Sequence, residues 1–187
     1  MMAAAVLLAS VASVTFYNDW KKEAEIRAIA MGIVSEIASM DLKSLPNSTE
    51  YFLPSKPYKI FLSTEYVSVV RNDGTFRKNI SVVKKFLVKP FVSCEIFPWK
   101  DGKEFHNYLL EKYGSAGNIS DPIPYNKISE VKTYLNDKLE EIAKKLAITP
   151  FQVDATKPLH IEKIFIYFEK DGRLKSISIL IVSQEVT

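Results

Sequence analysis

Cysteine, histidine and glycine are scarce in this chain of 187 residues. Cys94 is its single cysteine, so no disulfide can form within the chain. The two histidines, His106 and His160, stand in unrelated contexts without the spacing of metal ligands. Six glycines are too few to suggest a glycine-rich phosphate-binding loop. We therefore expect no metal and no cofactor.

The chain also lacks a large excess of either positive or negative charge, because its formal net charge is only +3. Basic pairs such as Lys84-Lys85 are short and lie among acidic residues. A nucleic-acid-binding protein would carry a basic stripe on one face, so we expect no nucleic-acid partner. The chain is 47% apolar and 25% charged, which is typical of a folded protein and excludes wholesale disorder. Its length suits one compact domain, with or without an appendage.

The most distinctive feature is an apolar run at the start of the chain. No charged residue precedes Asp19, and Met1–Tyr17 is mostly apolar. As a helix, this run would be about 25 Å long, a little short of the ~30 Å hydrocarbon core of a bilayer. It could be a removable signal peptide, a buried core helix, or a membrane or filament-core helix. The absence of a basic segment before the run favours the third interpretation over a signal peptide.

Small side chains recur within this run at every fourth position, at Ala5, Ala9 and Ser13. This spacing lets helix backbones approach closely, which is how helices associate in an apolar environment. We therefore predict that copies of the chain pack together through this segment. The predicted helix-packing residues are Ala5, Leu8, Ala9, Ala12, Ser13 and Phe16.

The helix is expected to continue past the first charged residues, because Asn18–Glu23 contains neither glycine nor proline. Apolar residues then follow at helical spacing and form a stripe, with polar residues opposite. The stripe comprises Ile26, Ile29, Ala30, Ile33, Ile37 and Met40. Such a stripe needs a globular surface to cover it. We predict one helix from Met1 to about Lys43, which divides the chain into a helix at 1–45 and a head domain at 46–187.

The head domain shows both strand and helix patterns. Strands are predicted at Tyr58–Leu62 and Tyr66–Val70, joined by Ser63–Glu65, and in the β-rich stretch Val82–Phe97, where Pro90 marks an edge or a bulge. Glu104–Tyr113 is expected to form a short helix ending at Gly114. Turn residues also predict a turn at 72–74 and a loop at 114–125.

A second, longer helix and a hairpin complete the head. Apolar residues from Ile128 to Leu146 recur at three- and four-residue steps, typical of a surface helix packed on a sheet. Asp171-Gly172 lies between two β-rich runs, a strong hairpin signal, and the second run is expected to bury one face. The predicted fold is therefore α+β: a long hydrophobic-then-amphipathic N-terminal helix packed on a mostly antiparallel sheet, with two further helices.

Residues 24–70 carry a family resemblance. An apolar N-terminal helix is followed by the Ala/Ile-rich segment Ala24–Ile37. Breaks at Leu45-Pro46 and Leu53-Pro54 come next, and then the two predicted strands. In this pattern, about 70 residues long, the chain resembles archaeal type IV pilin-like proteins, the class of archaellins and adhesive pilins. In that family the N-terminal helix anchors the precursor in the membrane and later forms the filament core.

The resemblance implies a surface filament subunit, whose partners are copies of itself and, before assembly, the membrane. Family precursors carry a short basic leader and a processing site before the apolar run. The sequence shows neither, so the resemblance implies a processed or truncated chain. The helical insertion Glu104–Ala147 exceeds a minimal pilin head, which keeps open an anchored accessory protein or minor pilin that binds a cell-envelope partner. A secreted domain with a cleaved signal is a third alternative.

Three segments fit the acceptor pattern for N-glycosylation, at Asn47, Asn79 and Asn118. Two of them fall in predicted loops, where a bulky sugar is tolerated. They favour an extracellular location, with coincidence as the alternative.

No catalytic constellation emerges from the sequence. Cys94 has His106 twelve residues later, but its apolar surroundings predict a buried, protonated thiol. Glu140 and Glu141 are neighbours on a predicted helix and point apart. A pairing of His160 with Glu162 on one strand face fits an exposed edge better than a catalytic pair. We therefore expect this protein not to be an enzyme.

Overall fold

The computed structural model describes residues 2–54, 58–82, 84–89, 99 and 101–184, with side chains described from Thr15 onward except at Lys89. Within this part of the chain the fold is α+β, as predicted. In order, its elements are α1 (Met2–Asp41), β1 (Asn47–Tyr51), β2 (Tyr58–Leu62), β3 (Tyr66–Arg71), β4 (Arg77–Ser81), β5 (Leu87–Lys89), α2 (Gly102–Tyr113), β6 (Ile123–Pro124), α3 (Ile128–Ile148), β7 (Phe151–Val153), β8 (Leu159–Lys170) and β9 (Arg173–Ser183).

The strands form two sheets where the sequence suggested one. The first sheet has the order β1-β8-β9-β5, and β6 pairs with the far end of β8. The second has the order β4-β3-β2-β7. Pairing is mostly antiparallel, as expected, but β5 lies parallel to β9 and β6 parallel to β8. The β2–β3 hairpin has the predicted strands, with Tyr58 opposite Arg71 and Leu62 opposite Val67.

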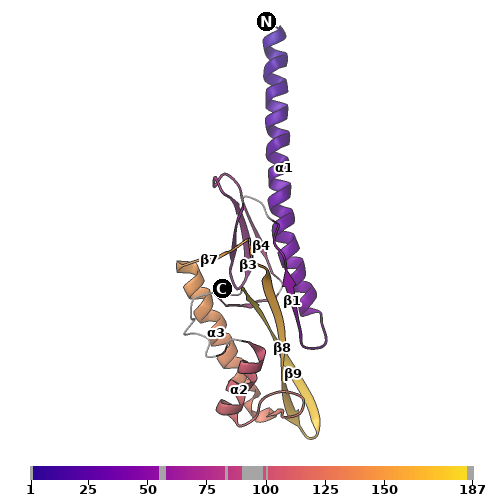
Figure 1. Ribbon diagram of the computed structural model, residues 1–187, viewed down its shortest axis with the longest axis vertical. Coiled ribbons are helices and arrows are strands. Elements are labelled where there is room, and N and C mark those ends of the chain that lie inside the picture. Colours follow the sequence, from indigo (N-terminus) through magenta and orange to yellow (C-terminus); the bar gives the residue numbers. More distant parts are fainter. Residues whose placement is uncertain (1, 55–57, 83, 90–98, 100, 185–187) are drawn as a thin grey trace.

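Helix α1 joins the two sheets. Its second half contacts β3 and β4 of one sheet and β8 and β1 of the other. Every residue of the predicted stripe is at most 8% exposed, and Ala30 and Ile33 are fully buried. The first half of the helix extends beyond the sheets (Figure 1). The predicted continuous helix is therefore confirmed, with bounds of Met2–Asp41.

One glycine lies where α1 meets the Tyr51 side chain of β1. A Cβ atom on Gly32 would lie 2.6 Å from the Tyr51 hydroxyl oxygen, which is closer than such atoms normally approach. A larger residue at this position would therefore require the Tyr51 side chain to shift.

The β8–β9 hairpin turns at Asp171-Gly172, as predicted. Both residues have positive φ, +51° and +70°, which is typical of the type I′ turn that matches the twist of paired strands. The register places Lys170 opposite Arg173 and His160 opposite Ser183, so the two strands pair along their whole length.

The prediction that β9 buries one face is wrong for its second half, where Leu180, Ile181 and Val182 are all buried. Helices cover both faces of the first sheet. Lys163, opposite Leu180, reaches the end of α1, whereas the Ile164 side chain packs 3.1 Å from the Cβ position of Gly102 in α2. Side chains on both faces of the second half of β9 are therefore buried.

Both predicted head helices are confirmed. The Asp101 side chain accepts a hydrogen bond from the Glu104 backbone at the start of α2, and Gly114 ends that helix with φ of +77°. Strands β1, β4, β6 and β7 were not predicted, because they are short or rich in polar residues. The expectations for Pro90 and Cys94 fall outside the described residues.

Replacing Ile33 with alanine should lower the free energy of unfolding by about 2–4 kcal/mol, because Ile33 is fully buried between α1 and the sheets. Chemical denaturation followed by the fluorescence of Trp99, which is 2% exposed, measures this change. The exposed Ser35→Ala should alter stability by less than about 0.5 kcal/mol. Equal effects of the two substitutions would contradict the burial of this stripe.

Candidate assembly helix and surface sites

The part of α1 that extends beyond the head presents large aromatic side chains to solvent. Phe16 is 75% exposed, and Tyr17 and Trp20 are each 61% exposed. The Tyr17 and Trp20 rings lie near one another, with centroids 6.4 Å apart. No described residue of the same chain buries these rings. An exposed aromatic group of this size is unfavourable in water and is typical of a surface that contacts a partner or a membrane interface.

The structure places all six predicted helix-packing residues on α1. Phe16 is exposed in the single chain, and its role in helix packing stays a prediction. The side chains of Ala5, Leu8, Ala9, Ala12 and Ser13 precede the first described side chain, so their packing stays a prediction.

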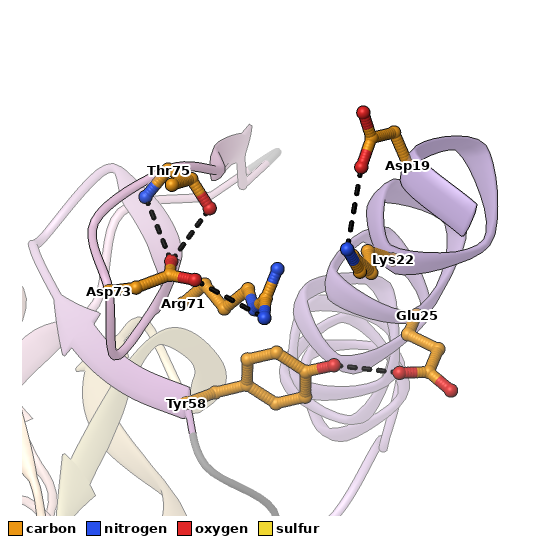
Figure 2. A network of polar contacts seen from close by, with 7 residues as sticks. All are labelled: Asp19, Lys22, Glu25, Tyr58, Arg71, Asp73 and Thr75. Atoms are coloured by element: carbon orange, nitrogen blue, oxygen red, sulfur yellow. Dashed lines mark hydrogen bonds and ion pairs between the residues drawn. The ribbon is translucent and has the colours of Figure 1, made fainter. Parts of the chain in front are cut away.

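Polar contacts lie along one side of α1 where it leaves the head (Figure 2). We call this group the polar collar; it comprises Asp19, Lys22, Glu25, Tyr58, Arg71, Asp73 and Thr75. The Tyr58 hydroxyl donates a 2.7 Å hydrogen bond to the Glu25 carboxylate and so connects β2 with the helix. Beside the collar, Lys78 of β4 lies 3.7 Å from the Glu23 carboxylate. The helix is therefore held laterally at its exit point.

Electrostatics within the collar follow from these contacts. Burial raises the pKa of Tyr58, and its hydrogen bond to Glu25 acts in the same direction. The backbone and hydroxyl of Thr75 both donate to Asp73, which lowers the pKa of that carboxyl. Arg71 lies 3.2 Å from Asp73 and stabilises the same turn.

The other end of α1 is capped by a lysine from the first sheet. Lys163 is 5% exposed, and its ammonium donates hydrogen bonds to the backbone oxygens of Asp41 and Lys43, the latter at 2.7 Å. These carbonyls have no partner within the helix, and a cation beside them is favourable to the helix dipole. Burial lowers the pKa of Lys163, while the nearby Asp41 carboxylate opposes that shift. Lys84 joins the cap through a 2.7 Å ion pair with Asp41.

The three predicted glycosylation sites differ in their surroundings. Asn47 begins edge strand β1 and is exposed, and Asn79 is exposed on edge strand β4. Asn118 is half-buried in the loop after α2, where its side-chain oxygen accepts hydrogen bonds from the backbone of Ser120 and Asp121 at 2.9 and 2.8 Å. Asn118 therefore has a structural role in its loop, whether or not its amide nitrogen carries a sugar.

Of the residues considered for chemistry, His106 and Glu162 line one pocket, together with Asn47 and Gly102, whereas Cys94 falls outside the described residues. His106 places Nδ1 2.7 Å from the Ala116 carbonyl, which makes Nδ1 the donor. Among described residues, no three His, Cys, Asp or Glu side chains gather closely enough to hold a metal ion.

Within the described part of the chain, no helix has both the length and the apolar character needed to cross a bilayer. Comparison with protein-family models, curated proteins and solved structures finds no match. Function is therefore inferred from the residues and geometry of this chain.

Two residues that fix α1 were missed from the sequence. Lys163 interrupts the apolar alternation of Leu159 and Ile161, and a lysine at a core-facing strand position is the available signal for a buried cap. No local pattern identifies Tyr58 as the partner of Glu25, because the two are 33 residues apart in the chain.

Lys163→Met should lower the free energy of unfolding by about 1–3 kcal/mol, because two carbonyl oxygens at the end of α1 lose their donor. Amide hydrogen exchange should accelerate in the last turn of α1. The exposed Lys175→Met is the matched control and should leave that turn unchanged. Unchanged exchange in Lys163→Met would show that the lysine does not cap the helix.

Asn118→Ala should destabilise the loop after α2 by about 1–2 kcal/mol, because two backbone N–H groups lose their acceptor. Asn79→Ala removes the same side chain from an exposed strand position and should change stability by less than about 0.5 kcal/mol. Thermal unfolding of unglycosylated protein compares the two variants. A larger loss for Asn79→Ala would contradict the structural role of Asn118.

Proposed function

We propose that this protein is a structural subunit of an archaeal type IV pilus-like surface filament, assembled through the first half of α1. The main support is the division of this helix. Its second half is buried on its own head, while its first half extends away and begins with a run that carries no charge before Asp19. Copies of the same apolar segment, packed side by side, would bury what the single chain leaves uncovered.

The physical basis is the instability of an isolated apolar helix in water. A helix that is apolar all round must be covered by lipid or by other helices. The small residues Ala5, Ala9 and Ser13 allow close backbone approach between copies. In the proposed sequence of events, the membrane covers the segment before assembly and neighbouring subunits cover it afterwards, with the heads facing outward at the cell surface.

An anchored accessory protein, or minor pilin, is the second candidate. Helices α2 and α3 enlarge the head beyond a minimal pilin head, and the exposed Tyr17 and Trp20 would suit a membrane interface next to a permanent anchor. This protein would bind a cell-envelope partner without forming filaments. A secreted domain with a cleaved signal is the third candidate, and N-terminal sequencing of the mature protein identifies it by the loss of the apolar run.

Full-length protein without detergent should form filaments or aggregates, whereas a variant lacking residues 1–20 should be a soluble monomer. The deletion removes the apolar run but keeps the buried stripe from Ile26 to Met40, so the head retains its core. Negative-stain electron microscopy and sedimentation velocity distinguish the two states. Fibres with a regular subunit repeat support the filament, whereas non-fibrous aggregates that become monomers in detergent support the accessory protein.

Point variants make this test specific to helix packing. Ala9→Leu adds bulk at the small-residue positions and should abolish or shorten the fibres. Ala3→Leu adds the same bulk outside the predicted packing residues and should leave the fibres intact. A full-length chain that stays monomeric in plain buffer would contradict both anchored candidates.

A further inference from the structure

One of the three acceptor segments for N-glycosylation lies on an open edge of the second sheet. Among described residues, strand β4 pairs only with β3, so no strand lies along its other side. Asn79 and Ser81, which define the acceptor pattern, are both exposed, whereas Ile80 between them packs against the core. Successive side chains of a strand point to opposite faces, so Asn79 and Ser81 share the exposed face of β4.

The hydrogen bonds between β3 and β4 tell which backbone groups face the open edge. The Arg71 N–H donates to the Phe76 carbonyl oxygen at 3.0 Å, so these two residues form a hydrogen-bonded pair. Such pairs alternate along an antiparallel ladder, and every second residue after Phe76 therefore bonds to β3. The N–H and C=O groups of Asn79 and Ser81 face outward instead. An enzyme can thus bind this segment as an extended strand without breaking the sheet.

The exposed face of β4 is also the face that points away from α1. The ammonium of Lys78 lies 3.7 Å from the Glu23 carboxylate of the helix, which places the Lys78 side chain on the helix side of the sheet. Because side chains alternate along the strand, Asn79 points to the opposite side. A sugar on Asn79 would therefore not lie between α1 and the helices of neighbouring subunits.

The other two acceptor segments lack this combination of features. Asn118 is half-buried, and its side-chain oxygen accepts two backbone hydrogen bonds within its own loop, so that loop must open before the amide can react. Asn47 is exposed, but Thr49, the hydroxyl residue of its acceptor pattern, is half-buried in β1. Asn79 alone of the three has an exposed amide, an exposed hydroxyl partner and outward backbone groups.

We propose that Asn79 is the principal N-glycosylation site of this protein and that its oligosaccharide projects from the head on the side away from α1. This inference rests on the cell-surface location in the proposed function. The sugar donor is a lipid-phosphate-linked oligosaccharide. A bond forms between Asn79 Nδ2 and the anomeric carbon of the first sugar while the bond from that carbon to the phosphate oxygen breaks. The lipid phosphate leaves with the bonding electron pair, and Nδ2 releases one proton to solvent.

The test uses full-length protein isolated from the surface fraction of its native cells. Trypsin cleaves after Lys78 and Lys84 and so separates Asn79 from the other two acceptor segments. Mass spectrometry should find an oligosaccharide mass on this peptide. Occupancy should be about tenfold lower at Asn118, because transfer there requires two hydrogen bonds to break.

Variants produced in the same cells identify the acceptor. Asn79→Gln and Ser81→Ala should each lose this mass, the second although the asparagine is retained. Asn72→Gln replaces an exposed asparagine outside any acceptor pattern, and this matched control should retain the mass.

An unmodified Asn79 in surface protein, or an oligosaccharide mass that persists in Ser81→Ala, would overturn the proposal. Fibres in the same surface fraction would then still support the filament, so the two failures are distinguishable. Absence of the protein from the surface fraction would contradict the proposed location and this inference together.

Discussion

Burial of one stripe of α1 against two sheets is the constraint on which the structure depends. Ile33 and Ala30 lie at the centre of this contact and are fully buried. Because the same helix contacts β3 and β4 on one side and β8 on the other, it connects the sheets as well as covering them. Because the second half of this straight helix is buried against the sheets, its first half extends away from the head (Figure 1). In the proposed function, a surface outside its own subunit covers the apolar start of the chain.

Polar contacts at the two ends of the buried second half of α1 also hold the helix in this orientation. The hydrogen bond from Tyr58 to Glu25 holds the helix where it leaves the head, and Lys163 caps its last turn from within the first sheet. Exposed ion pairs contribute little on their own, whereas a buried donor that satisfies two carbonyl oxygens is costly to lose. The apolar stripe therefore contributes more than the exposed ion pairs to holding the helix on the sheets, and the cap fixes where the helix ends.

Much of the fold could be predicted from the sequence because its largest elements have strong local patterns. The isoleucine stripe, the Asp171-Gly172 turn and the glycine at position 114 each specify their structure within a few residues. The division into two sheets could not be predicted, since it depends on pairings between distant segments such as β2 with β7. For the candidate site, the sequence located the helix and its buried stripe, while the cap by Lys163 required the tertiary structure.

Electron cryomicroscopy of assembled full-length protein tests the central claim most directly, because it would reveal where the first half of α1 lies between subunits. The account predicts a core of closely packed helices formed by residues 2–20 of several copies, with the heads arranged around it. The amphipathic second half of each α1 should remain packed on the sheets of its own head. A map in which the heads alone make the contacts, or in which this segment folds back onto its own head, would contradict it.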